Sequence, residues 1–220
     1  MPPIDVVPVN ASPGPTTRHP PIGTSRRRIV AIDLPTFASD LALGRWRRRR
    51  RDHPGPPTRE PLVIVFTERG GRRVVRNCCS RSRDRGVQGG MTVVEARSLL
   101  RGDDDPRDGG FEPILVATNP ARETGALRRL GIRCLAWTPI VAIDGDRRIL
   151  LDIRGCEGWL ARRGGELGLL QRIDSVLARL GMRARLAIAD TVVASRAWAA
   201  RPPDPRAVTP LRKHRIQIGR

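Results

Sequence analysis

The sequence predicts an α+β fold in which helices pack against one face of a sheet, and two patterns support this. Short apolar runs bounded by proline or glycine alternate with longer segments whose apolar residues recur at helical spacing. Two β-rich runs flank the pair Gly70-Gly71, which is typical of a β-hairpin. With 220 residues, the chain is long enough to bury a core as one domain or two small ones.

The balance of charged residues favours a polyanionic partner. Lys and Arg total 41 against 22 Asp and Glu, a net charge of +19, so nucleic acid is the first expectation and an acidic membrane surface the second. Arginine supplies nearly all of this charge, since Lys213 is the sole lysine, and a bias in genome composition is the alternative explanation. No apolar run approaches the roughly 20 residues of a membrane span, so we expect a cytoplasmic protein without a membrane partner.

The cysteines and histidines do not predict a metal site. None of Cys78, Cys79, Cys134 and Cys156 belongs to a C-x-x-C pair, and the histidines lie far from them in the sequence. Reduced thiols are the expected state in a cytosolic protein, and we expect no cofactor.

The first structured segment is expected to follow a proline-rich tail. Residues 1–27 are rich in proline and small polar residues, a composition typical of disorder. Residues 29–32 predict a short buried strand that Pro35 ends, and residues 36–50 suit a helix. The run RWRRRRRDHPGPPTRE, residues 45–60, is expected to be a basic linker broken by prolines.

A separate small unit is expected at residues 61–110. It begins with the hairpin around Gly70-Gly71 and continues with the glycine-bounded turn GVQGGM. A helix then follows Thr92, with Glu95 three residues on, as in a capping box.

The segments in residues 111–205 complete the main sheet. In chain order they predict a strand at 112–118, a helix at 119–132 with Pro120 near its start, a strand pair at 133–144 and 147–153, an amphipathic helix at 166–182, a strand at 183–190 and a helix from 191. Without the inserted unit, this order is that of a ferredoxin-like α+β sheet. Residues 206–220 form an atypical tail whose composition suggests a frameshifted or truncated end.

Four of these segments resemble, in order and spacing, the Y-family (translesion, UmuC-like) DNA polymerases. VAIDLPTFASDLA resembles the palm strand that ends in a metal-binding aspartate, with Asp33 in that place. RSRDRGVQGGMTVVEAR resembles the fingers, and Arg83 falls where the family keeps an arginine that contacts the triphosphate. WTPIV and LLDIRGC resemble the strands around the second metal motif, and Arg196 lies roughly where the family has a lysine.

The resemblance covers residues 28 to about 205 and implies a domain organisation. Residues 28–60 would be the first part of the palm with a basic linker, 61–110 the fingers, and 111–205 the second part of the palm. The thumb and little-finger domains of the family are not evident in this chain.

The family's adjacent pair of metal-binding acids is replaced. Aligned without a gap, the Asp-Glu pair falls on Arg147 and Arg148, and Asp146 lies one place early, which in a strand turns its side chain to the other face. Two-metal catalysis needs several carboxylates around ions about 3.5–4 Å apart. At 4 Å and an effective dielectric near 20, one pair of unit charges contributes about 4 kcal/mol. We therefore expect the two arginines to prevent metal binding, leaving Asp33 as a vestigial ligand or simply a helix cap.

This loss resembles the ImuB-like branch of the family, whose members are catalytically defective and act in bacterial SOS mutagenesis. AIDLP, GVQGGM, LLDIRGCEGWL and LGMRARLAIADT carry that resemblance. It implies a non-catalytic adaptor in translesion synthesis and DNA repair after DNA damage. The implied partners are DNA, a RecA-like accessory protein and an error-prone replicative-type polymerase. The tail that binds the sliding clamp in such proteins is absent from this chain.

Two other functions stay open. An active DNA-directed nucleotidyltransferase would use Asp33 with Asp144 or Asp146 and would need Mg²⁺. A generic basic nucleic-acid-binding protein, or a non-functional truncated remnant, would account for the charge alone.

The candidate binding residues each have a functional and a structural interpretation. Arg47, Arg48, Arg49, Arg50 and Arg51 follow Trp46 and would make an electrostatic funnel for DNA with a stacking aromatic, or a solvated face. Arg83 and Arg196 would contact phosphate groups, or are ordinary solvated arginines of an Arg-rich chain.

Overall fold

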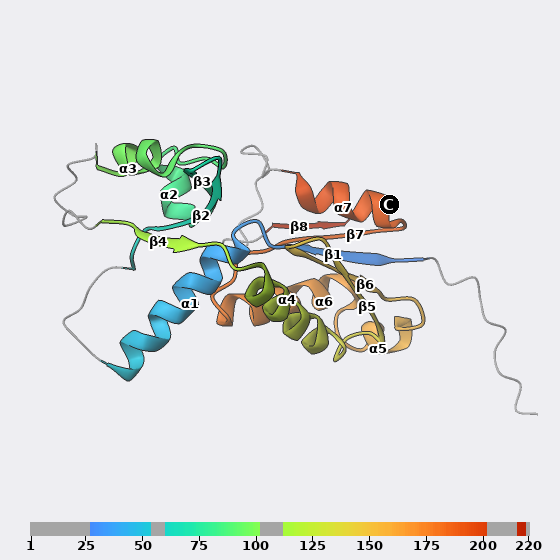
Figure 1. Ribbon diagram of the computed structural model, residues 1–220. Coiled ribbons are helices and arrows are strands. Elements are labelled where there is room, and N and C mark those ends of the chain that lie inside the picture. The colour runs from blue at the N-terminus through green and yellow to red at the C-terminus, as the bar shows by residue number, and fades with distance from the viewer. Residues whose placement is uncertain (1–26, 54–59, 102–111, 202–214, 219–220) are drawn as a thin grey trace, which may run out of the picture.

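The chain folds around two β-sheets, one of five strands and one of three (Figure 1). The computed structural model describes residues 27–53, 60–101, 112–201 and 215–218, the last as backbone only. Three expected segments lie outside the described residues: the tail expected at 1–27 apart from its last residue, the loop after residue 101, and most of the tail expected at 206–220.

The five-stranded sheet confirms the ferredoxin-like prediction. Its strands, in spatial order, are β5 (Ile140–Asp144), β6 (Arg148–Asp152), β1 (Ile29–Asp33), β7 (Arg185–Ala189) and β8 (Arg215–Ile218). The first four pair antiparallel with their neighbours, and their order is that of the ferredoxin-like sheet. At the edge, β8 pairs parallel with β7.

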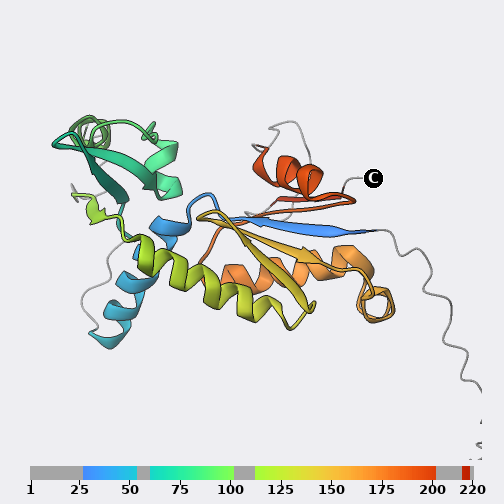
Figure 2. The same cartoon turned by 45° about the vertical axis from the view of Figure 1, so that its right-hand side comes forward.

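Helices cover both faces of this sheet, whereas the sequence predicted helices on one face. α4 (Pro120–Cys134) and α6 (Gly165–Arg179) cover one face and enclose the main apolar core, with the short α5 (Glu157–Ala161) beside α6. α7 (Val192–Ala200) packs on the opposite face, as Figure 2 also shows. The small side chains of Ala31 and Ala187 line that face and allow α7 to approach through Ala199.

The expected inserted unit forms the three-stranded sheet with two helices. β2 (Val63–Arg69) and β3 (Arg72–Cys78) make the predicted hairpin, α2 (Ser80–Asp84) and α3 (Val93–Arg101) follow, and β4 (Ile114–Ala117) pairs parallel with β2. The turn residues Gly70 and Gly71 have φ angles of 55° and 71°, which only glycine adopts readily. β4 falls in the range expected for the second part of the palm, yet it belongs to this sheet.

The predicted cap of α3 is confirmed, and α4 begins at the predicted proline with a further cap from Asn119. At α3, Thr92 Oγ1 accepts from the Glu95 backbone N–H at 3.2 Å, and Glu95 Oε2 accepts from the Thr92 N–H at 2.8 Å. At α4, Asn119 Oδ1 accepts from the Arg122 N–H at 2.9 Å, and Pro120 opens the helix.

The basic linker expected at residues 45–60 is wrong in its first half. α1 (Phe37–Asp52) continues through the whole arginine run and ends just before His53. Arginine is a good helix former, and no proline interrupts the chain until Pro54, so nothing local stops the helix earlier. Among the described residues, no helix is both long and apolar enough to cross a membrane.

Candidate functional site

Four charged residues form a row across the five-stranded sheet, at the end where β1 runs toward α1. Asp144 pairs with Arg148, Arg148 with Asp33, and Asp33 with Arg185. Directly paired residues of antiparallel strands present their side chains on the same face. The row therefore alternates negative and positive charge across four neighbouring strands.

Asp33 is the buried centre of this row. It is fully buried, and its Oδ1 accepts from Arg147 Nε at 3.2 Å and from Arg148 Nη2 at 3.3 Å. Arg148 Nη1 also donates to Asp144 Oδ2 at 2.9 Å, and Arg196 Nε lies 3.1 Å from the same oxygen. The structure thus joins the predicted residues Asp33, Arg147, Arg148 and Arg196 in one network of ion pairs.

The donor set around Asp33 does not fit a divalent metal ion. Magnesium-type ions require several oxygen ligands and are repelled by nearby guanidinium groups. Here two guanidinium groups occupy one side of the only fully buried carboxylate of the row, whose Oδ2 has no hydrogen-bond partner. Within the described ranges, no group of three or more His, Cys, Asp or Glu side chains is placed to hold a metal ion.

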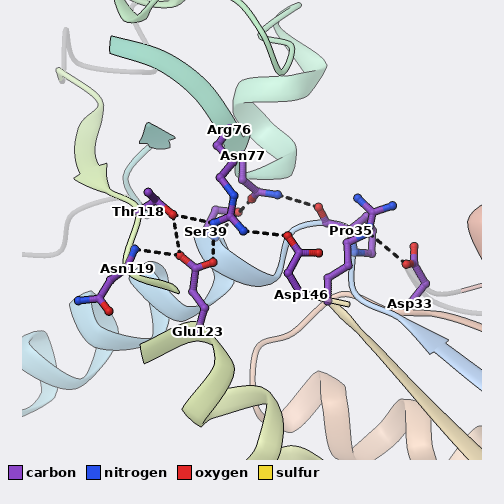
Figure 3. Close-up of polar contacts among 10 residues, drawn as sticks. Asp33, Pro35, Ser39, Arg76, Asn77, Thr118, Asn119, Glu123 and Asp146 are labelled. Carbon is purple, nitrogen blue, oxygen red and sulfur yellow. Dashed lines mark hydrogen bonds and ion pairs between the residues drawn. The ribbon is translucent and has the colours of Figure 1, made fainter. Parts of the chain in front are cut away.

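Asp146, the other acid considered for catalysis, is held elsewhere. Its Oδ2 accepts from Arg76 Nη2 at 2.8 Å, and Figure 3 shows it turned toward Arg76 and away from Asp33. Arg76 belongs to β3 in the three-stranded sheet, while Asp146 lies in the β5–β6 turn. The slip of one place expected from the sequence therefore separates Asp146 from the Asp33 network.

Arg76 also fastens the two sheets together through a buried acid. Its Nη1 donates to Glu123 Oε2 at 2.5 Å and to Thr118 Oγ1 at 2.7 Å. Glu123, buried at the start of α4, accepts further from the Thr118 hydroxyl at 3.2 Å and the Asn119 N–H at 3.1 Å. We call Arg76, Thr118, Glu123 and Asp146 the Arg76 latch (Figure 3).

A second connection lies beside the latch. Asn77 Nδ2 donates to the Pro35 carbonyl at 2.9 Å, and Asn77 Oδ1 accepts from the Ser39 N–H at 3.4 Å (Figure 3). Sequence reasoning missed both connections. The polar pair Arg76-Asn77, between the buried Val75 and Cys78 of β3, is the signal that would have marked them.

The two arginines predicted to contact phosphate groups, Arg83 and Arg196, differ in their relation to the Asp33 network. Arg83 is exposed on α2, beside the Cys78 thiol, whose pKa burial raises. Arg196 is half-exposed on α7 and is held only by Asp144. The structure thus brings Arg196 into the Asp33 network but not Arg83.

The arginine run forms the outer half of α1. At about 1.5 Å per residue, Arg48 lies roughly 16 Å along the helix from Phe37. Arg47 is paired with Glu60, and the Arg50 guanidinium lies 5.8 Å from the centre of the Trp46 ring. Arg48, Arg49 and Arg51 are exposed, and none makes an ion pair with another described residue. These three arginines carry the positive charge of the run that no described acid neutralises.

Positive charge accumulates where α1 approaches α4. Burial and the neighbouring Arg122, Arg49 and Arg48 guanidinium groups lower the pKa of Arg45. Burial is the larger cause, and the neighbouring guanidinium groups add a local positive potential, which attracts phosphate groups.

Comparisons with known proteins find similarity both in sequence and in fold. Over 90 residues the chain is 46% identical to the protein ImuB of two strains of Caulobacter vibrioides, a match covering 40% of this chain and 18% of that protein. The chain superposes on a post-insertion binary complex of Dbh DNA polymerase with a TM-score of 0.63 and 13% identity, covering 88% of this chain and 48% of that one. For DinB from Sulfolobus solfataricus the TM-score is 0.58, the identity 13%, and the coverage 87% and 48%. No protein-family model matches the chain.

The chain spans about half the length of these solved polymerases, and the matched segment is a smaller share of the curated relatives. Because the superposition on the Dbh complex covers 88% of this chain, it includes parts of both sheets.

Proposed function

We propose that this chain, which has the palm-and-fingers fold of Y-family DNA polymerases and is ImuB-like in sequence, is a non-catalytic DNA-binding adaptor. It acts in translesion synthesis, as part of the SOS response to DNA damage, and in the cytoplasm. One observation carries the non-catalytic part: Arg147 and Arg148 both donate to Asp33, the acid that a metal-dependent polymerase would need there. The proposal includes no Mg²⁺ and no other cofactor.

DNA contact is proposed through exposed arginines. The solved structures that the chain resembles are DNA polymerases, which supports a DNA partner. Arg48, Arg49 and Arg51 present free charge on α1, and Arg83 and Arg196 are exposed on α2 and α7. Phosphate contacts of this kind release counterions and so make binding salt-dependent.

The protein partners of the proposal come from the resemblance. A RecA-like accessory protein and an error-prone replicative-type polymerase would bind the adaptor. Co-elution of each purified candidate with the chain on gel filtration tests this, and separate elution of both would leave a DNA-binding protein without the adaptor role.

The non-catalytic assignment is tested by Mn²⁺ titration followed by electron paramagnetic resonance. We expect the chain and its Asp33→Ala variant to bind Mn²⁺ equally, because the guanidinium groups exclude a cation from Asp33. In parallel, primer extension with Mg²⁺ or Mn²⁺ should show no incorporation by either protein. A Mn²⁺ site lost in Asp33→Ala, or incorporation that this variant abolishes, would establish the nucleotidyltransferase instead.

DNA binding is tested by fluorescence anisotropy at increasing salt on a primer–template and on plain duplex. Substituting Arg48, Arg49 and Arg51 by alanine should weaken binding to both and reduce the slope of log K against log salt by about 2 to 3. The matched control substitutes Arg163, in the turn before α6, and Arg172 and Arg179 on α6 by alanine, which removes the same charge. Equal affinity for both DNAs, with equal losses in both variants, would favour a generic basic binder.

A further inference from the structure

A groove runs along α6, on the face of the five-stranded sheet that α4 and α6 cover. It has a volume of about 430 Å³ and is lined by side chains along α6, by the turn before this helix and by Trp137, which follows α4. The α6 helix is 15 residues long, or about 22 Å. The groove lies on the face of the sheet opposite the Asp33 row, since Val30 and Ile32 point into the α4–α6 core and Asp33 does not.

Three arginines line the groove and have no acidic partner. Arg163, Arg172 and Arg179 are exposed, and none forms an ion pair with any residue that the structure describes. The two acids of α6, Glu166 and Asp174, do not line the groove, and Glu166 is engaged by Arg28, whose Nε donates to Glu166 Oε1 at 2.7 Å. The groove therefore has unbalanced positive charge along the length of the helix.

An apolar side chain is exposed among these arginines. Leu167 is 44% exposed, whereas Leu169 and Leu170, which follow it in α6, are buried in the core. Trp137 is only partly buried at the other wall. The groove thus combines an apolar anchor point with cationic sides.

At one end of the groove, the backbone of the turn before α6 packs closely against Gly168. A Cβ at this position would lie 2.2 Å from the Arg163 carbonyl oxygen, so only glycine allows the turn before α6 to pack against the helix. This packing holds Arg163 with its guanidinium 4.6 Å from the centre of the Trp159 ring. Arg172 lies 5.9 Å from the same ring.

From this arrangement we infer that the groove binds an acidic peptide segment of a protein partner, with an apolar side chain seated at Leu167. Carboxylates complement the three arginines, and an apolar residue covers the exposed leucine. A single-stranded nucleic acid fits less well, because the Arg163 and Arg172 guanidinium groups already lie over the Trp159 ring and would compete with a base for stacking there. The inference does not depend on DNA binding.

The test uses a fluorescein-labelled peptide of about 14 residues, which matches the helix length. It consists of Glu and Asp with two leucines, and a control peptide has serines in place of the leucines. We expect alanine substitution of Arg163, Arg172 and Arg179 to weaken binding about tenfold, since each exposed ion pair contributes a factor of about 1.5 to 5. Alanine substitution of Arg48, Arg49 and Arg51 removes the same charge and should leave affinity within about twofold, because these residues do not line the groove and act on the peptide only through screened long-range attraction. Leu167→Ser should weaken the leucine peptide but not the serine peptide.

Three results would overturn the inference. Equal losses from the α6 and α1 triple variants would show non-specific attraction to a basic protein. Absence of any measurable binding would show that the groove is not a peptide site. An oligothymidine that displaces the peptide, and loses affinity only in the α6 triple variant, would assign the groove to nucleic acid. Circular dichroism of each variant checks that the exposed substitutions leave the fold intact.

Discussion

Arg148 lies directly opposite Asp33 in the pairing of β6 with β1, and its Nη2 donates to Asp33 Oδ1 at 3.3 Å. On its other side, Arg148 pairs with Asp144 of β5. Its side chain is 13% exposed and that of Asp33 is fully buried. One guanidinium group thus neutralises two carboxylates in a nearly dry position, which makes it part of the structure of the sheet.

Arg148→Ala should therefore destabilise the fold strongly. It leaves Asp33 buried with Arg147 as its remaining partner, and removing one member of a buried pair typically costs about 3–5 kcal/mol. Arg147→Ala is the matched control, because Arg147 is 46% exposed and Arg148 would still neutralise Asp33. We expect the control to cost about 1 kcal/mol or less. Urea unfolding measures both values, and similar losses in the two variants would contradict this division of roles.

The Arg76 latch predicts a specific role in holding the two sheets together. Arg76→Ala leaves the buried Glu123 carboxylate without its ion-pair partner, and we expect a loss of about 2 kcal/mol in the free energy of unfolding. Arg73→Ala, on the same strand, removes an exposed pair with Glu68 and should cost less than about 1 kcal/mol. Hydrogen exchange locates the effect: amides at the start of α4 should lose protection in the first variant. Unchanged exchange there would show that the latch does not couple the sheets.

The local elements of this fold could be predicted because their signals are local. The cap of α3 by Thr92 and Glu95, and the turn at Gly70-Gly71, depend on residues within a few positions of one another. The replacement of a metal motif by Arg147 and Arg148 was visible because the resemblance supplied a register for the hairpin. The structure adds that both side chains reach Asp33.

The long-range relationships could not be predicted in the same way. Arg76 on β3 and Glu123 on α4 are 47 residues apart, so only the tertiary structure makes them partners. The helix predicted at residues 36–50 is confirmed, but the linker predicted from residue 45 was wrong, because an arginine run has no apolar periodicity although its helix propensity is high. The groove along α6 was missed since the sequence shows only the buried stripe of that helix.

Alanine substitution is expected to have opposite effects at Gly158 in α5 and at Gly168 in α6. Gly168→Ala would place a Cβ 2.2 Å from the Arg163 carbonyl oxygen, which is backbone and cannot rotate away. We expect a loss of about 1–3 kcal/mol, as for other overpacked sites. Gly158→Ala, in α5, meets no atom within 4 Å and should be neutral or stabilise by up to about 1 kcal/mol. Thermal unfolding of both variants checks this, and a stable Gly168→Ala would mean that the turn can move.

Asp40 on α1 predicts that part of the stability is lost as the pH rises. Burial raises its pKa from the ordinary 3.8 to about 6, although the Arg183 N–H and the Thr36 hydroxyl donate to its Oδ2 at 3.0 and 2.8 Å. Between these two pH values the folded chain binds more protons than the unfolded chain, so this contribution is complete below about pH 4 and lost as the pH passes 6. Asp40→Asn keeps an acceptor oxygen without the charge, and should exceed the wild type in stability by on the order of 2 kcal/mol at pH 8 but match it near pH 4. Urea unfolding across this range measures the difference in the free energy of unfolding between the two proteins. Titration of the other acids cancels in this difference. A difference that does not change with pH would show that Asp40 stays ionised throughout.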